Sequence, residues 1–252
     1  MLSKFIRVIK LVIKPIIFFF VKYECVICEE EVRIKSPVCF NCNRKIGAIN
    51  QSSVCEKCGR YCLAQHCIFC LQNPPYFKQG KAFCVYDATS SRVIKQFKYY
   101  GNSLCREFMA KKMTQILQRD FLKNGVEIDL ITCVPMSWFK EYLNGKNHAG
   151  QLSSKIAKNV GIKYNPNLLK RKFKFKRQVL LNQKDRIENV RGVFTTKNCS
   201  EIVGKSILII DDTITTGATL NECTKALLQS SANNIFVLTF GKSIADETIY
   251  KV

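Results

Sequence analysis

One stretch of the sequence combines a short apolar run, two adjacent acids, a threonine-rich loop and a helix, and it limits the fold more than any other feature. The run Ile207–Ile210 predicts a buried strand, because continuous β-branched apolar residues are typical of a sheet covered on both faces. Asp211 and Asp212 follow where that strand should end, and Gly217 precedes a helix predicted over Ala218–Leu228. This order of elements indicates an α/β fold with a ligand site at the carboxyl ends of the strands.

The loop after the two acids is suited to an anion. Backbone N–H groups and the helix dipole favour a phosphate at a helix N-terminus, and threonine hydroxyls can donate further hydrogen bonds. Asp211 and Asp212 would repel that anion unless they face a neutral group that donates hydrogen bonds, such as the vicinal hydroxyls of a ribose. The chemistry therefore predicts a sugar 5′-phosphate. The alternative is a buried strand followed by a threonine-rich helix cap without a ligand.

Residues 207–219 resemble the motif with which type I phosphoribosyltransferases bind 5-phosphoribosyl-1-pyrophosphate (PRPP), and we call them the PRPP motif. The one departure is Thr213, where an aliphatic residue is more usual. The resemblance implies that Asp211 and Asp212 are the catalytic carboxylates and that Mg²⁺ is bound together with PRPP. The residues that it assigns to PRPP binding are Asp211, Asp212, Thr213, Thr215, Thr216, Gly217, Ala218 and Thr219.

The chain has 14 cysteines, and many of them form Cys-x-x-Cys pairs near the N-terminus. Because no cleavable signal sequence is expected, these pairs indicate structural zinc in a reducing compartment rather than disulfides. Redox chemistry is the alternative, and Cys62 or His66 could replace a ligand. The spacing leaves open whether the pairs combine sequentially or interleaved. The predicted ligands are Cys25, Cys28, Cys39, Cys42, Cys55, Cys58, Cys67 and Cys70.

Residues 1–22 are apolar but interrupted by cations at Lys4, Arg7, Lys10 and Lys14, which fall on one side of a helix. The uninterrupted apolar run after them is too short to span a bilayer. The pattern predicts a basic amphipathic helix on an anionic membrane face, or alternatively a helix packed on the rest of the protein. We divide the chain into this helix (1–22), a zinc-binding module (23–75) and a phosphoribosyltransferase-like domain (76–252).

Strands and helices alternate through the third region, which predicts a mainly parallel α/β sheet with flanking helices. The predicted fold class is therefore type I phosphoribosyltransferase-like, with a small N-terminal cysteine-rich zinc module. Beside the elements of the PRPP motif, we expect strands at Ala82–Tyr86, Ile128–Val134 and Ile235–Thr239 and helices at 91–101, 104–122 and 149–159.

Further segments resemble the ComF competence proteins: residues 93–102, the run from Arg186 to Phe194 and the cysteine pairs. This resemblance covers most of the chain from Cys25 onward. It implies a cytoplasmic protein that helps to bring single-stranded DNA across the inner membrane during natural transformation, and the amphipathic helix predicted over 1–22 would make it peripheral on that membrane. Its implied partners are PRPP, single-stranded DNA, the anionic inner-membrane surface and components of the DNA-uptake machinery.

The pyrophosphate side departs from the family pattern. Where the family has Arg, Phe and Gln, this chain has Asn144, Lys146 and His148, and Phe175 replaces a threonine of the flexible loop. Transfer chemistry requires pyrophosphate to be held as it leaves, so catalysis is left open while PRPP binding is expected. The residues assigned to pyrophosphate and its loop are Lys98, Asn147, Arg171 and Gln178.

Residues 170–177, which we call the basic run, mix cations with aromatic rings, and the whole chain carries a net charge of +21. Phosphate neutralisation and base stacking suit single-stranded nucleic acid. The alternative is a strand with its phenylalanines in the core and its lysines in water. The predicted nucleic-acid residues are Lys170, Arg171, Lys172, Phe173, Lys174, Phe175, Lys176 and Arg177. Three functions compete: a PRPP-binding DNA-handling protein, a transferase for a nitrogenous acceptor, and a zinc-module scaffold with a residual transferase fold.

Overall fold

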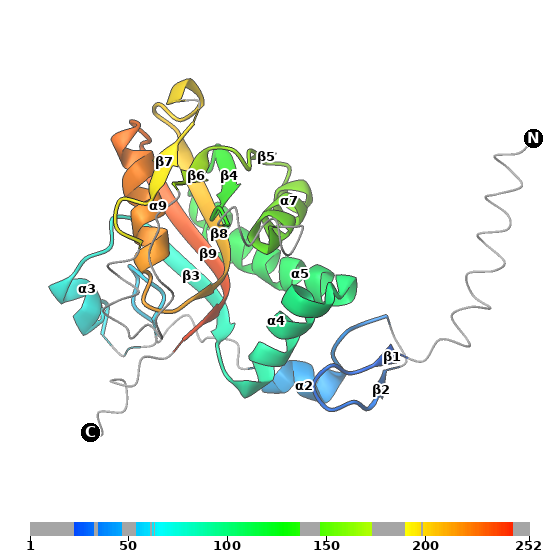
Figure 1. Ribbon diagram of the computed structural model, residues 1–252. Coiled ribbons are helices and arrows are strands. Elements are labelled where there is room, and N and C mark those ends of the chain that lie inside the picture. Colours follow the sequence, from blue (N-terminus) through cyan, green and yellow to red (C-terminus); the bar gives the residue numbers. More distant parts are fainter. Residues whose placement is uncertain are drawn as a thin grey trace, which may run out of the picture.

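The computed structural model describes residues 23–32, 35–46, 54–60, 62, 64–136, 147–172, 190–197 and 199–243 (Figure 1). Several predictions lie outside the described residues: the helix over 1–22, the loop residue Gln178 and the altered positions 144 and 146. The same holds for the second part of the basic run, which comprises Phe173, Lys174, Phe175, Lys176 and Arg177. Within the described part of the chain, no helix combines the length and the apolar character needed to cross a membrane.

Five parallel strands form the central sheet in the order β3-β9-β8-β4-β5. Their bounds are Gln79–Val85 for β3, Leu130–Cys133 for β4, Lys163–Tyr164 for β5, Ser206–Ile214 for β8 and Asn234–Lys242 for β9. Helices pack on both faces of this sheet. The predicted fold class, a parallel α/β sheet of the phosphoribosyltransferase kind with cysteine-rich N-terminal segments, is confirmed.

Strand β8 shows why the apolar runs of this sequence are continuous. Its residues point alternately to the two faces of the sheet, and both faces are covered. Leu208 and Ile210 belong to the core on one face, while Ile207 and Ile209 belong to the core on the other face. All four side chains are fully buried, so neither face tolerates a polar residue at these positions.

Three helices cover the first face: α4 (Ala88–Tyr100), α5 (Ser103–Asp120) and α7 (His148–Val160). Helix α4 begins at a capping box of Asp87 and Ser90 and ends at Gly101, which adopts the left-handed conformation with a φ of 63°. These are the start and stop signals expected of a stable helix. The predicted helices thus lie where the sequence indicated: α4 begins three residues earlier than predicted, α7 is one residue longer at each end, and α5 ends at Asp120, two residues before its predicted end.

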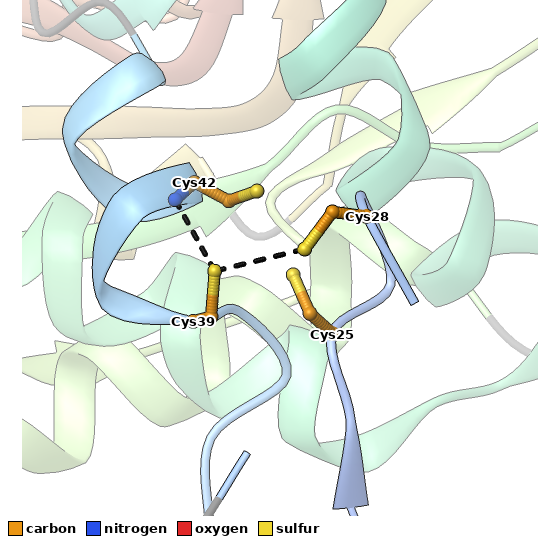
Figure 2. Close-up of side chains that lie close together, drawn as sticks. All are labelled: Cys25, Cys28, Cys39 and Cys42. Atoms are coloured by element: carbon orange, nitrogen blue, oxygen red, sulfur yellow. Dashed lines mark hydrogen bonds between the residues drawn. The ribbon is translucent and has the colours of Figure 1, made fainter. Parts of the chain in front are cut away.

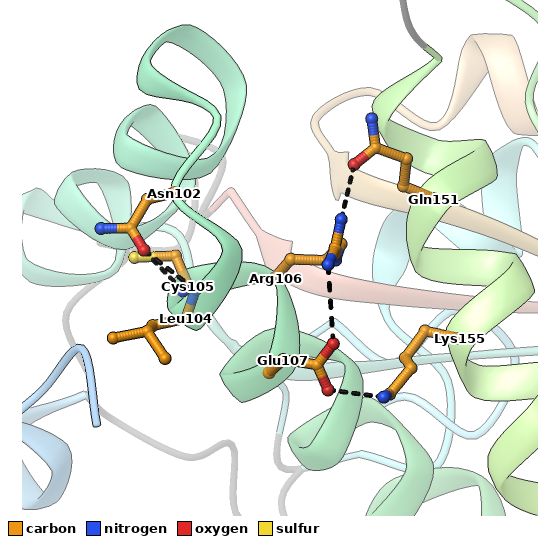
Figure 3. A network of polar contacts seen from close by, with 7 residues as sticks. All are labelled: Asn102, Leu104, Cys105, Arg106, Glu107, Gln151 and Lys155. Atoms are coloured by element: carbon orange, nitrogen blue, oxygen red, sulfur yellow. Dashed lines mark hydrogen bonds and ion pairs between the residues drawn. The ribbon is translucent and has the colours of Figure 1, made fainter. Parts of the chain in front are cut away.

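Polar contacts hold α5 and α7 together above the core (Figure 3). Glu107 of α5 binds Lys155 of α7 at 2.7 Å, and Arg106 Nη1 donates a hydrogen bond to Gln151 Oε1 at 3.3 Å. At the start of α5, the Asn102 side chain accepts hydrogen bonds from the backbone N–H groups of Leu104 and Cys105. The contacts fix the register between the two helices, while burial of their apolar faces supplies most of the stability.

Helix α9 (Ala218–Gln229) covers the second face together with a two-stranded antiparallel ribbon, β6 (Leu169–Arg171) and β7 (Phe194–Thr196). Two 3₁₀ turns, Leu122–Asn124 (η2) and Cys199–Glu201 (η3), connect elements at the amino edge of the sheet. In Figure 1 the ribbon and α9 stand on the side of the sheet opposite to α4, α5 and α7.

The cysteine-rich segment does not form one core within its described residues. Strands β1 (Tyr23–Glu24) and β2 (Glu31–Val32) and helix α2 (Phe40–Lys45) pack with the first face, near α4. The later cysteines and helix α3 (Ile68–Gln72) pack with the second face. The two halves of the region predicted as one module thus pack on opposite faces of the sheet. Its boundaries at 23 and 75 stay predictions.

Strand β8 continues to Ile214, beyond the predicted end at Ile210. The extension pairs with β9, where Asp211 lies opposite Thr239 and Thr213 lies opposite Gly241. Apolar pattern alone ended the predicted strand at the acids. The backbone continues as a strand because its neighbour β9 is equally long, so the two carboxylates lie within the strand rather than after it.

Candidate functional site

The PRPP motif forms a small pocket at the carboxyl end of β8. Its volume is about 50 Å³. The lining residues are Asp211, Thr213, Ile214, Thr215, Thr216, Gly217, Ala218, Thr219 and Leu220. The structure thus brings together around one pocket all the residues assigned to PRPP binding except Asp212, which lies directly beside it.

Gly217 shapes the floor of this pocket. It has a φ of 81°, in the left-handed region that favours glycine, and it is the N-cap of α9. Because glycine has no side chain, no side chain caps the helix, and the Thr216 hydroxyl accepts only the Ala218 N–H at 3.3 Å. The first turn of α9 therefore presents backbone donors and the positive end of the helix dipole to the pocket.

Asp212 is held by two neighbours. Its Oδ1 lies 2.7 Å from Lys98 Nζ and accepts a hydrogen bond from the Thr213 hydroxyl at 2.8 Å. The carboxylate is buried, and Lys98 comes from the last turn of α4. The ion pair therefore joins α4, on the first face, to the PRPP motif. Lys98, predicted for the pyrophosphate side, is the residue of that group that the structure places against the motif.

Asp211 lies in a less favourable setting. Burial and the adjacent Asp212 carboxylate raise its pKa to about 8, although the Asp212 backbone N–H donates to its Oδ1 at 2.8 Å. Two carboxylates side by side cannot both be ionised without a cation or hydrogen-bond donors. A bound polyhydroxyl ligand, which donates hydrogen bonds, or a bound cation would therefore allow both carboxylates to be ionised.

Lys98 and His148 face this pair of acids. Burial alone would lower the pKa of Lys98, but the carboxylates of Asp212 and Asp211 overcome this effect and raise it. Burial lowers the pKa of His148, whose ring packs edge-on against Phe97 at 5.3 Å between centroids. At neutral pH the site thus contains a charged lysine and a neutral imidazole.

Asn147 serves the fold at the position predicted for pyrophosphate contact. It is the N-cap of α7, with Oδ1 accepting from the Gly150 N–H at 3.1 Å. Its Nδ2 donates to the Val134 carbonyl at 3.2 Å. Asn147 thus fixes α7 against the end of β4, and its assignment to pyrophosphate stays a prediction.

The described part of the basic run begins on β6. Lys170, Arg171 and Lys172 are exposed, and the Arg171 guanidinium lies over the Phe194 ring at 5.7 Å. Hydrogen bonding to Lys197, a second cation on the same ribbon, lowers the pKa of Lys170. Two ammonium groups in contact on an exposed ribbon repel each other, and an anion between them would remove that repulsion.

Two four-cysteine clusters form the other candidate sites. Cluster 1 comprises Cys25, Cys28, Cys39 and Cys42, and cluster 2 comprises Cys55, Cys58, Cys67 and Cys70. In each cluster the sulfur atoms all lie within 4.8 Å of one another. Figure 2 shows the four sulfurs of cluster 1 converging from the turn after β1 and from the start of α2. The pairs combine sequentially, which the spacing had left open.

The sulfur distances fit a tetrahedral metal ion. Cys28 Sγ and Cys39 Sγ are 3.7 Å apart in cluster 1, and Cys58 Sγ and Cys67 Sγ are 3.7 Å apart in cluster 2. Tetrahedral ligands at about 2.3 Å from a central ion are separated by about 3.8 Å. Both clusters therefore have the donor set and dimensions of a four-thiolate site.

The thiol electrostatics of the two clusters differ in origin. Burial would raise the pKa of Cys58, but the Lys242 ammonium and the Arg60 backbone N–H lower it to about 7. The pKa of Cys25 is also lowered to about 7, against the effect of burial, by backbone N–H groups including those of Cys39 and Cys28. A side-chain cation favours the thiolate in cluster 2, whereas the peptide backbone does so in cluster 1.

A larger pocket, of about 520 Å³, lies at the opposite edge of the sheet. It opens at the amino ends of β8 and β9, beside Ser206 and Asn234, and mixes acids such as Glu56 with cations such as Lys57. Ligands of parallel α/β sheets bind at the carboxyl ends of the strands. The pocket of the PRPP motif is therefore the better candidate despite its smaller volume.

Comparisons with known proteins agree with the motifs. No family model matches the chain. Competence protein F of Haemophilus influenzae is 27% identical over 223 residues, covering 86% of this chain and 96% of that protein. The chain is a homologue of competence protein F. The DNA utilization protein YhgH of Escherichia coli K12 is 23% identical over 198 residues, covering 77% of this chain and 86% of that protein. The predicted ComF resemblance is thereby confirmed.

Solved phosphoribosyltransferases resemble only part of the chain. Adenine phosphoribosyltransferase from Saccharomyces cerevisiae is 16% identical, with a TM-score of 0.39, and covers 57% of this chain and 72% of that one. Glutamine PRPP amidotransferase from Bacillus subtilis is 22% identical, with a TM-score of 0.35, and this chain spans only 25% of its length. At these TM-scores the fold assignment depends on the sheet topology and the motif, not on the superposition.

Sequence reasoning missed several residues of this competence protein F homologue. Arg60 and Lys242 are buried beside cluster 2. The sequence signal for Lys242 is a lysine at the end of an otherwise apolar strand. Tyr99 and Tyr100 are each 76% exposed at the end of α4, next to Lys98. Helical spacing from the buried Phe97 could have placed both rings outside the core.

Proposed function

We propose that the PRPP motif binds PRPP together with Mg²⁺. The observation that carries this proposal is the uncapped start of α9 at Gly217, which closes a pocket that the Asp211 carboxylate and several threonine hydroxyls also line. Backbone N–H groups and the hydroxyls of Thr215, Thr216 and Thr219 would hold the 5′-phosphate. Asp211 and Asp212 would accept hydrogen bonds from the ribose hydroxyls.

Mg²⁺ would supply charge neutralisation for the pyrophosphate group. On the protein side, Lys98 orients the Asp212 carboxylate through their 2.7 Å contact. The pKa of Asp211 is raised in the free protein. Hydrogen bonds donated by the ribose hydroxyls would stabilise its carboxylate, so that Asp211 would bind the ligand. The binding of a polyhydroxyl ligand thus reduces the electrostatic repulsion between the carboxylates of Asp211 and Asp212.

We propose ligand sensing, rather than phosphoribosyl transfer, as the role of this pocket. Asn147, which stands on the pyrophosphate side, uses both ends of its amide to fix α7 to β4. His148, which replaces the family glutamine, turns its ring against Phe97. Release of pyrophosphate requires donors that are free to follow the developing charge, and these two residues are already engaged in packing.

We further propose that the protein handles incoming single-stranded DNA, in keeping with relatives that are named for competence and for DNA utilization. The contact of Lys170 with Lys197 and the exposed Arg171 and Lys172 form a basic surface on the ribbon β6–β7. Tyr99 and Tyr100 offer exposed rings for base stacking beside the PRPP motif. Phosphate contacts along the ribbon and stacking at the end of α4 suit single strands of any sequence.

We propose Zn²⁺ as the ion of both clusters, with a role in folding. Each cluster offers four sulfur atoms and no other ligand type within its set, as in structural zinc sites, which leave no coordination position open.

Residues 1–22 would carry the protein to the anionic cytoplasmic face of the inner membrane. Flotation with anionic liposomes, with and without these residues, tests that location, and equal binding would refute it.

One titration tests the main proposal. PRPP with Mg²⁺ is added to the zinc-loaded protein while single-stranded DNA affinity and pyrophosphate release are followed together. We expect PRPP to bind, DNA affinity to change and pyrophosphate not to be released with candidate bases. Release with a base would instead establish the transferase, and failure to bind both ligands would favour a scaffold.

The matched variants for this titration are Asp211→Asn with Asp212→Asn, and Asp129→Asn as control. Asp129 lies at the amino edge of the same sheet, where it pairs with Lys205 at 3.1 Å, far from the motif along β8. Loss of a charge-assisted pair of contacts should weaken PRPP binding at least about tenfold in the double variant. Equal affinity of the double variant and the control would refute the assignment of the pocket.

A further inference from the structure

Two buried cations lie beside cluster 2. The exposed fraction of Lys242 is 4% and that of Arg60 is 9%. Lys242 Nζ donates a hydrogen bond to the carbonyl oxygen of Cys58. The guanidinium of Arg60 lies over the Phe69 ring at 4.1 Å, and its buried Nε and Nη1 have no hydrogen-bond partner among the described residues.

These cations would be unfavourable beside neutral sulfur. The charged groups that act most on Lys242 are Cys58, Arg60 and Cys67, so the two cations also repel each other. Buried charges without compensation strongly destabilise a folded protein. Neutral thiols or disulfides would leave both charges uncompensated, whereas four thiolates around a divalent ion carry a net charge of about −2.

We propose that Arg60 and Lys242 form the outer shell of cluster 2, neutralising its metal–thiolate charge and positioning the ion against the sheet. The proposal rests on the proposed binding of Zn²⁺ by that cluster. The two positive charges balance the net charge of the loaded site. The free N–H groups of Arg60 are the available donors for thiolate sulfurs, a type of contact that tunes and orients metal ligands.

The same residues connect the ion to the PRPP motif. Lys242 pairs in register with Ile214, and the Ser243 N–H donates to the Ile214 carbonyl at 2.9 Å. Ile214 in turn lines the motif pocket. Metal loading of cluster 2 therefore supports the end of β8 through Lys242.

Contacts of the cysteine turn with β3 make this connection rigid. The Gly80 N–H donates to the Lys57 carbonyl at 2.8 Å. A Cβ added at Gly59, which has a φ of 69°, would lie 2.8 Å from the Gly80 carbonyl oxygen. Only glycine allows the turn of cluster 2 to lie this close to the strand, so the ion and the sheet move together.

The test measures zinc retention. Zinc release to a colorimetric chelator is followed for the full chain and for Lys242→Met, Arg60→Met and Lys242→Arg, with Arg92→Met as matched control. Arg92 donates a hydrogen bond to the carbonyl of Ile27, in the turn that carries Cys25 and Cys28, at 2.6 Å. The Arg92→Met variant therefore removes an analogous contact at cluster 1. We expect one zinc per chain to be held about 10–100-fold more weakly in the two cluster 2 methionine variants.

The second readout separates charge from packing. Co²⁺ substituted for Zn²⁺ reports each four-thiolate site by its absorption, and ribose 5-phosphate affinity reports the motif pocket. We expect Lys242→Arg to retain the metal and Lys242→Met to lose both metal and sugar-phosphate affinity. If Lys242→Arg and Lys242→Met lose metal alike, or if both methionine variants retain it like the control, the proposal is overturned. A wild-type chain without zinc would instead refute the zinc proposal itself.

Discussion

Cluster 1 and cluster 2 each place one pair of sulfurs 3.7 Å apart, but their surroundings differ. In cluster 2 all four cysteines are buried, whereas in cluster 1 Cys28 is exposed and Cys39 is partly exposed. Arg92 reaches cluster 1 from the surface of α4, while Lys242 reaches cluster 2 from the end of a core strand. The same ligand geometry is thus embedded in two different environments.

The two halves of the cysteine-rich segment also pack against different cores. Cluster 1 packs with α4 and α5, and cluster 2 packs with the core that contains Ile209 and Leu220 of the PRPP motif region. Loss of an ion from a partly exposed site leaves ligands that water can solvate. Loss from a buried site beside two cations leaves charges that water does not reach.

The largest expected effect comes from removing one ligand in each cluster. Cys58→Ser should destabilise the protein by about 3–5 kcal/mol, because it disrupts a buried, charge-balanced site. Cys28→Ser, at the exposed position of cluster 1, should cost clearly less. Thermal unfolding of the two zinc-loaded variants measures the difference. Equal melting temperatures would remove the distinction between the clusters.

A second contrast concerns DNA. Replacing both Lys170 and Lys197 by glutamate removes the adjacent cations of the ribbon β6–β7, on the face of cluster 2. Each phosphate contact contributes about 0.7 to the slope of log affinity against log salt for single strands, so that slope should fall by about 1.4. Salt titration by fluorescence anisotropy measures it. The control is Lys158→Glu, an exposed position on α7 on the face of cluster 1, and an equal fall there would show only a nonspecific charge effect.

The third prediction concerns pH. The pKa of Asp211 is raised to about 8 in the folded chain. The unfolded chain therefore releases this proton at a lower pH than the folded chain, and the free energy of unfolding falls as the pH rises from about 4 to about 8. Asp211→Asn removes this loss. We expect the variant to exceed the wild type at pH 8 by several kcal/mol, because each unit of pKa shift corresponds to about 1.4 kcal/mol, and by a smaller margin at pH 5.

The measurement for Asp211→Asn is thermal unfolding at both pH values without phosphate ligands. The same variant should bind PRPP more weakly, which would show that the acid is kept for the ligand and not for the fold. A stability gain that does not depend on pH would contradict the raised pKa. Asp129→Asn, whose carboxyl pKa is lowered by the Ser206 N–H and by Lys205, should lose stability instead.

The smallest expected effect is at the anchor of cluster 1. Arg92→Met removes one exposed hydrogen bond to the Ile27 carbonyl, which should cost about 0.5–1.5 kcal/mol. Thermal unfolding measures this cost, and PRPP affinity should stay unchanged because α4 keeps Lys98 in place. A loss of PRPP affinity in this variant would show that cluster 1 also supports the pocket.

The sequence by itself determined the local elements and the chemistry that they carry. Apolar runs predicted the core strands, the alternation with helical segments predicted α4, α5, α7 and α9, and the order of acids, threonines and Gly217 predicted the pocket. The eight cysteines of the two clusters also followed from spacing alone. These features depend on neighbours within a few residues along the chain, so the pattern contains the necessary information.

Only the tertiary structure decided how these parts combine. The length of β8 depends on its pairing with β9, and the sequential pairing of the cysteines depends on how each turn packs against the sheet. Lys242 meets Cys58 across a separation of 184 residues, which no local pattern encodes. Burial and charge balance arise when distant segments meet, and for that reason the two clusters look alike in sequence and differ in the folded protein.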